Sequence, residues 1–168
     1  MSLARPPLDP PPAADSLDRH WLSSHIPHQG RMCLLDEVLA WDMAQIRCRA
    51  SSHRLADHPL RAGGRLGAAC GVEYAGQAMA AHGALIAALT GIAARTGYLA
   101  SVRDLQMHVT RLDDLAGDLL VSAWRLAGDE DTALYGFALA CADRALLSGR
   151  AGIVFGALAA GEIARGGP

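Results

Sequence analysis

The sequence predicts an α+β fold in which an antiparallel sheet wraps around one long central helix. Strand-like segments occur in the order two strands, one long helix and then four strands, without the regular strand–helix alternation of a parallel sheet. The helical segment, from about residue 66 to 90, is apolar around nearly its whole circumference. We therefore expect other elements to cover this helix on most sides.

The sequence before the helix predicts a leader, a short helix, two strands and a loop. Residues 1–15 contain five prolines and predict a disordered leader, after which a short helix starts at about Asp15 or Ser16. Two strands are expected at 33–41 and 45–51, joined by a turn. Residues 52–65 carry His53, His58, Pro59, Gly63 and Gly64, which predicts a loop.

The segments after the helix are expected to be strands. Leu105, Met107 and Val109 alternate with polar residues, which predicts a half-buried strand. Three more strands fit at 119–126, 133–141 and 145–155, with turn signals between them. A sheet of these strands around one apolar helix is the hotdog architecture. We expect one domain over 16–156 and a flexible tail over 157–168.

Composition indicates a globular protein without a basic surface for nucleic acid. The chain has 168 residues, of which 51% are hydrophobic and 19% charged, and its net charge is −2. All its basic residues are arginines, which excludes lysine Schiff-base chemistry. The four cysteines are scattered, which favours reduced thiols in the cytoplasm over disulfides or a zinc site. The proline-rich start is unlike a signal peptide.

Glu73 is the most informative residue of the chain. It is the only charged residue between Arg65 and Arg95, and it lies in the first turns of a helix that should be buried. A carboxylate in such a place usually has a function, although a solvent-facing strip or a capping contact would also explain it. Gln77 follows four residues later on the same face and could hydrogen-bond the carboxylate. The uncharged stretch after Glu73 is long enough for a bilayer, but its polar and small residues favour a buried core helix.

His58 lies in the loop that precedes the helix. Histidine is the usual acid–base group near neutral pH, but a loop histidine is more often an ordinary surface residue. We read the six other histidines as structural or exposed, with His82 on a helix face and His108 on a solvent-facing strand. Spacing alone does not decide between these interpretations.

Several segments resemble the FabA/FabZ-type 3-hydroxyacyl-ACP dehydratases, in the order of that family. Residues 26–38 (IPHQGRMCLLDEV) resemble its opening segment, and Glu73-Tyr74-Ala75-Gly76-Gln77 resembles its helix motif. His58-Pro59 precedes Glu73 at close to the family's spacing, and Ala116-Gly117-Asp118 resembles its Pro-Gly-Asp turn. The similarity covers residues 25–155. With residues 97–104 (GYLASVRD), it is closest to the hotdog dehydratases of aryl polyene clusters.

The resemblance implies a mechanism and a set of site residues. His58 would be the base at C2, and Glu73 the acid for the leaving hydroxyl, its pKa raised by desolvation. Gln77, Gly67 and Ala68 would bind the substrate, with free backbone N–H groups at the helix start near Ala68 polarising the thioester carbonyl. The family's His loop and its Pro-Gly helix start are altered here, at residues 57–61 and 67–68, which affects substrate fit.

The implied function is dehydration of a 3-hydroxyacyl chain on a phosphopantetheine-bearing acyl carrier protein. The product would be a trans-2-enoyl thioester, in fatty-acid or aryl polyene biosynthesis, with no metal or organic cofactor. Family members place the histidine of one protomer against the acid of the other, so we expect a homodimer or a heterodimer with a paralogue. Two alternatives stay open: a hotdog thioesterase in which Glu73 activates water, and a non-catalytic subunit that pairs with an active paralogue.

Overall fold

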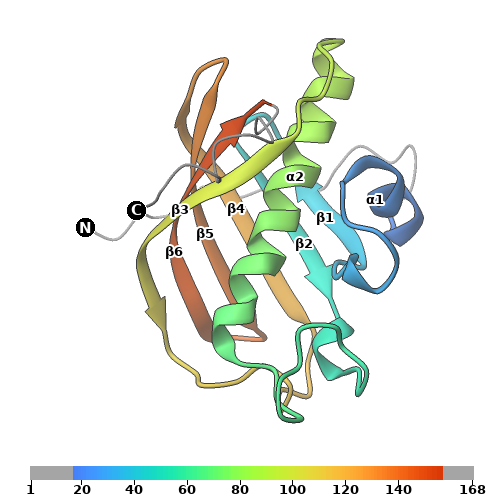
Figure 1. The fold of residues 1–168 in the computed structure, drawn as a ribbon, viewed down its shortest axis with the longest axis vertical. Coiled ribbons are helices and arrows are strands. Elements are labelled where there is room, and N and C mark those ends of the chain that lie inside the picture. The colour runs from blue at the N-terminus through green and yellow to red at the C-terminus, as the bar shows by residue number, and fades with distance from the viewer. Residues whose placement is uncertain (1–16, 157–168) are drawn as a thin grey trace, which may run out of the picture.

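A six-stranded antiparallel sheet, in the order β1-β2-β4-β5-β6-β3, curves around helix α2 (Gly71–Thr90), as Figure 1 shows. The computed structural model describes residues 17–156. The elements besides α2 are α1 (Arg19–His25), β1 (Glu37–Trp41), β2 (Gln45–Ala50), β3 (Gly97–Met107), β4 (Leu119–Gly128), β5 (Thr132–Cys141) and β6 (Arg144–Phe155). The predicted fold class and the hotdog architecture are confirmed. The predicted leader and tail lie outside the described residues.

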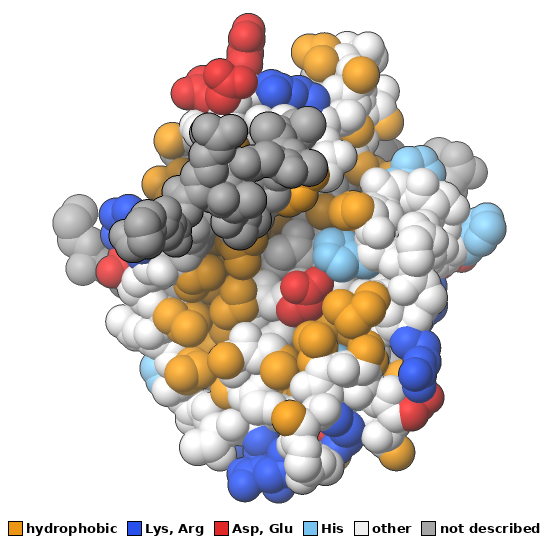
Figure 2. Space-filling model, viewed as in Figure 1, with side chains coloured by type: hydrophobic (Ala, Val, Ile, Leu, Met, Phe, Trp, Pro, Cys, Tyr) orange, Lys and Arg blue, Asp and Glu red, His pale blue; other side chains and the backbone are white. Residues whose placement is uncertain are grey.

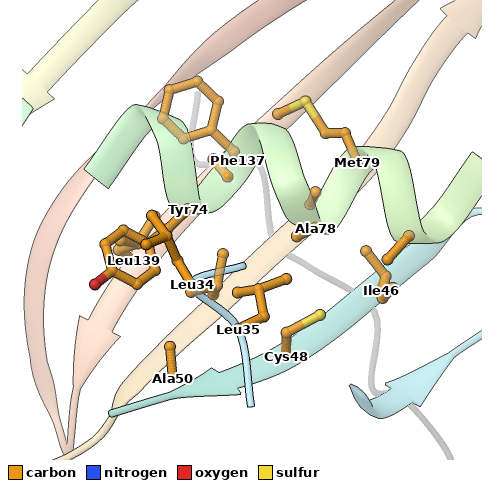
Figure 3. Close-up of a cluster of buried hydrophobic side chains, with 14 of the residues drawn as sticks. Leu34, Leu35, Ile46, Cys48, Ala50, Tyr74, Ala78, Met79, Phe137 and Leu139 are labelled. Atoms are coloured by element: carbon orange, nitrogen blue, oxygen red, sulfur yellow. The ribbon is translucent and has the colours of Figure 1, made fainter. Parts of the chain in front are cut away.

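Helix α2 packs on the sheet through small side chains. Ala75, Ala78 and Ala81 have no exposed surface, so the backbone of α2 comes close to the strands behind it. Figure 3 shows Ala78 and Met79 of α2 among side chains from β2 and β5. Burial of each large apolar side chain in this layer contributes about 1.5–3 kcal/mol. No helix among the described residues is long and apolar enough to cross a membrane.

The ends of α2 differ in how well the sequence predicted them. The helix ends at Thr90 as predicted, because Gly91 adopts a left-handed conformation with φ of 69°. It begins at Gly71, after a short 3-10 helix, and not near Leu66. Leu66 instead donates its N–H to the Asp113 carboxylate and accepts the N–H of Leu112. These long-range bonds hold the backbone groups that a helix would have used.

The first predicted strand is also shorter in the structure. It was expected from Cys33, but β1 begins at Glu37. Leu34 donates its N–H to the Gln77 side chain, and its carbonyl accepts from Ser52. Since these side chains take both backbone groups of Leu34, this residue cannot join a strand ladder.

Strand β3 departs most from the prediction. The alternation over 105–110 predicted a half-buried strand, but β3 covers Gly97–Met107 and lies at the edge of the sheet. Leu105 and Met107 are 37% and 52% exposed. Two register shifts against β6 interrupt the strand, and Asp104 has φ of 52°. Sequence alternation could not reveal that, among residues 17–156, no further strand pairs with this edge.

Candidate active site

Glu73 lies in the first turn of α2, and its side chain is 34% exposed. Its Oε1 is 3.0 Å from Nε2 of His28, which comes from the loop after α1, and it accepts a second hydrogen bond from Gln77 at 3.1 Å. Figure 2 shows the face that carries α2, where acidic and histidine side chains lie close together among hydrophobic ones in a shallow hollow. A carboxylate in such a hollow is accessible to a substrate.

The protonation of Glu73 differs from the expectation. The hydrogen bond from His28 lowers the pKa of Glu73 below its ordinary value, and it outweighs the burial that would raise it. The bond from Gln77 acts in the same direction. The expected rise of this pKa by desolvation is therefore wrong for the single chain, in which Glu73 is ionised near neutral pH. Burial has the smaller effect on this pKa, because the carboxylate is only half-buried and accepts hydrogen bonds from two donors.

Gln77 has no exposed surface, and its amide is fully engaged. Its Nε2 donates to the Met32 carbonyl at 2.7 Å as well as to Glu73, and its Oε1 accepts the Leu34 N–H at 2.8 Å. The predicted hydrogen bond between Gln77 and Glu73 is confirmed. The predicted role in substrate binding stays a prediction, and complete burial favours an indirect role through the carboxylate.

His58 is buried in a separate network, with only 3% of its surface exposed. Its Nδ1 accepts the N–H of Leu60 at 3.1 Å, and its Nε2 lies 3.0 Å from the hydroxyl of Tyr74. That hydroxyl is 2.7 Å from Oγ of Ser52, which donates to the Leu34 carbonyl at 2.8 Å. Burial lowers the pKa of His58, which favours the uncharged ring.

The direction of each hydrogen bond in this network follows from the carbonyl at its end. A carbonyl only accepts, so the hydrogen of Ser52 points to it, and Tyr74 must donate to Ser52. Tyr74 has no second hydrogen, and therefore Nε2 of His58 carries the hydrogen and donates to it. Both ring nitrogens of His58 are thus occupied, and the ring has no free lone pair in this arrangement.

The two predicted catalytic residues do not meet within one chain. Among residues 17–156 there is no hydrogen bond or ion pair between His58 and Glu73. Leu34 links the two networks, because its carbonyl belongs to one and its N–H belongs to the other. Each of the two side chains therefore has its own set of partners within the described chain.

The N–H of Ala68 is not a free oxyanion donor in the structure. It donates to the Thr110 carbonyl at 3.1 Å, and Ala68 is only 3% exposed. Gly67 is exposed and forms an isolated bridge with Arg111. Ala68 begins the short 3-10 helix that leads into α2, but its own N–H is taken by the segment at residues 110–113. The roles of Gly67 and Ala68 in substrate binding stay predictions.

Three residues of these networks were missed or misjudged in the sequence. His28 was read as structural or exposed, although it stands in the Pro-His segment that resembles the dehydratase opening. Tyr74 and Ser52 carried no local signal, because only the fold brings the 52–54 turn against α2. His82 lies outside these networks and is fully buried, between the Asp42 carbonyl and the Tyr135 hydroxyl, which agrees with a structural histidine on a helix face.

Comparison with known protein families gives one decisive match. The model of the ApeP-like family, described as ApeP dehydratase, matches residues 21–157. The chain belongs to the ApeP-like dehydratase family. A comparison with curated protein sequences gives no match.

Solved structures share the fold. The dehydratase heterocomplex ApeI:P from Xenorhabdus doucetiae matches with a TM-score of 0.72 and 19% identity, over 82% of this chain and 91% of that one. Zebra fish thioesterase superfamily member 2 matches with a TM-score of 0.57 and 15% identity, over 82% and 95%. A putative thioesterase from Shewanella oneidensis gives 0.55 and 14%, over 82% and 93%. At these identities the structures support the hotdog fold alone.

Proposed function

We propose that this ApeP-like protein dehydrates a 3-hydroxyacyl thioester carried by an acyl carrier protein. The observation that carries the proposal is the place of Glu73, the only acidic side chain of the central helix, on an accessible face of a dehydratase-family fold. In the reaction a base removes the C2 proton, the C3–O bond breaks, and an acid protonates the departing hydroxyl to give water and a 2-enoyl thioester. The base then returns its proton to the acid, so that no net proton is consumed.

In this proposal His58 is the base and Glu73 the acid, and they come from two different chains. The absence of a contact between them within one chain supports a shared site. Removal of a proton requires a free lone pair on His58. Nε2 carries the ring hydrogen, so the bond from the Leu60 N–H to Nδ1 must open when substrate binds. Glu73 must also gain a proton, which closure of the site over a substrate would favour by desolvation.

The exposed edge strand β3 supports pairing with a second subunit. Four of its apolar side chains are 37% to 52% exposed: Tyr98, Leu99, Leu105 and Met107. An edge with unpaired backbone groups and apolar side chains is a surface for strand addition. The partner is a second copy or a paralogue, and the second choice is favoured by the solved relative, which is described as a heterocomplex.

One observation favours a second candidate, a thioesterase. A half-buried, ionised Glu73 suits a general base that activates water, and His58 would then have no direct part. The closed network of His58 likewise fits a subunit that supplies only Glu73 to the site of a paralogue. Both alternatives predict reaction products or subunit requirements that differ from those of the dehydratase.

Product analysis distinguishes the three possibilities. Purified protein is incubated with a 3-hydroxyacyl carrier protein, and the carrier is measured by mass spectrometry. A dehydratase leaves the acyl chain on its carrier with one water lost, whereas a thioesterase releases the free carrier thiol. Glu73→Gln and His58→Ala should each reduce turnover by about a hundredfold or more. Glu130→Gln, an exposed acid in the turn before β5, is the matched control and should leave turnover unchanged.

Two results would contradict the assignment. Full turnover in either variant would exclude that residue from the chemistry. Activity that appears only when a paralogue is added, and that survives His58→Ala but not Glu73→Gln, would show that this chain supplies only the acid.

A further inference from the structure

We propose that His28 is the positioning residue of Glu73, which orients the carboxylate and keeps it ionised until substrate arrives. Its Nε2 lies 3.0 Å from Oε1 of Glu73, and the two side chains are 26% and 34% exposed. The catalytic consequence rests on the proposed function, whereas the effect on the carboxylate itself does not.

His28 is held firmly enough to orient a partner. The residue follows α1, whose C-cap residue Ile26 is only 3% exposed and donates its N–H to Leu22. On the other side of His28, the amide of Gln29 donates to the Ser23 carbonyl at 2.9 Å. The loop that presents the imidazole is therefore anchored before and after it.

The hydrogen bond between the ring and the carboxylate has a defined direction. An ionised carboxylate only accepts, so Nε2 of His28 carries the hydrogen. The other ring nitrogen, Nδ1, is buried and has no hydrogen-bond partner among the described residues. Nε2 is therefore the only ring atom of His28 that forms a hydrogen bond among the described residues.

The second donor to the Glu73 carboxylate is uncharged. Gln77 donates to the same oxygen at 3.1 Å and is itself fixed by the loop at residues 32–34. No titratable side chain besides His28 shifts the pKa of Glu73 in the described part of the chain. His28 is therefore the one titratable side chain in the described part of the chain that acts on the pKa of this carboxylate.

Removal of the donor gives a signed expectation. The hydrogen bond from His28 lowers the pKa of Glu73, so its loss raises that pKa toward the ordinary value. An acid catalyst is active on the basic side up to its own pKa. Under the proposed function, the basic limb of the pH–rate profile therefore moves to higher pH when His28 is replaced.

The direct test is the titration of Glu73 in the folded protein, followed by carboxyl ¹³C NMR. Glutamate labelling gives few signals, because the chain has four glutamates, Glu37, Glu73, Glu130 and Glu162. The signal that is missing in Glu73→Gln is that of Glu73. His28→Phe removes the donor, and we expect the midpoint of Glu73 to rise by about half a pH unit or more. His28→Gln keeps an N–H donor and should stay closer to wild type. His20→Phe, at an exposed histidine of α1, is the matched control and should have no effect.

An unchanged midpoint in His28→Phe would overturn the proposal. His28→Ala serves as a second donor-free variant if His28→Phe fails to fold, and it carries the same expectation. A raised midpoint in a protein without dehydratase activity would refute the proposed function and leave the role of His28 intact. Normal dehydratase activity with an unchanged midpoint and pH profile would refute the role of His28 alone.

Discussion

Tyr74→Phe tests the buried hydrogen-bond chain on which the state of His58 depends. The phenol ring is fully buried beside Leu34 and Leu139, as Figure 3 shows, and phenylalanine keeps that packing. Only the hydroxyl is lost, and with it the bonds to His58 and Ser52. Burial raises the pKa of Tyr74 to about 12, so the lost group is a protonated hydroxyl at every pH of the experiment.

The magnitude follows from the partners that remain. Ser52 keeps its donation to the Leu34 carbonyl, so it loses only an incoming bond. His58 is left with a buried N–H and no acceptor, which costs about 1–3 kcal/mol. We expect the free energy of unfolding to fall by about 2 kcal/mol, which corresponds to a Tm lower by roughly 4–8 °C for a chain of this length.

The assay is equilibrium unfolding in urea, supported by calorimetry. Tyr98→Phe is the matched control, because the Tyr98 hydroxyl makes no hydrogen bond in the described part of the chain and the residue is 37% exposed. This control should change the free energy of unfolding by less than about 0.5 kcal/mol. Equal stability of the two variants would refute the reasoning, as would a ¹⁵N spectrum in which neutral His58 carries its hydrogen on Nδ1.

Two further predictions concern the shared site and pH. Subunit exchange between the inactive His58→Ala and Glu73→Gln proteins should restore activity. About half of the resulting dimers are hybrid, and each hybrid has one intact site, so activity should approach about one quarter of wild type. Exchange without recovery would place each site within one chain. Burial lowers the pKa of His53, His58 and His82, so the unfolded chain binds protons below about pH 6.5 that the folded chain excludes. The free energy of unfolding should therefore fall as the pH is lowered from 7.5 to 5.5, by up to about 1.4 kcal/mol per pH unit per histidine. Coinciding denaturation curves at pH 7.5 and pH 5.5 would contradict this.

The bounds of individual elements show which of them follow from the local sequence and which depend on long-range contacts. The end of α2 at Thr90 was predicted because Gly91 is a local signal for a left-handed C-cap. Its start was misplaced because Leu66 makes bonds to residues more than forty positions away, which no local pattern contains. The exposed β3 was taken for a half-buried strand for the same kind of reason.

The sequence by itself determined the fold class and singled out Glu73 as the candidate site residue of the central helix. An apolar helix among strands without strand–helix alternation has few ways to bury its surface, and a lone carboxylate in that helix stands out from composition alone. The bond of Gln77 to Glu73 was also within reach, because i and i+4 positions adjoin on any helix. Only the tertiary structure decided the partners of the histidines, since His28 reaches Glu73, and His58 reaches Tyr74, across loops. The pKa of Glu73 depends on such partners, and for that reason its direction could not be predicted from the sequence.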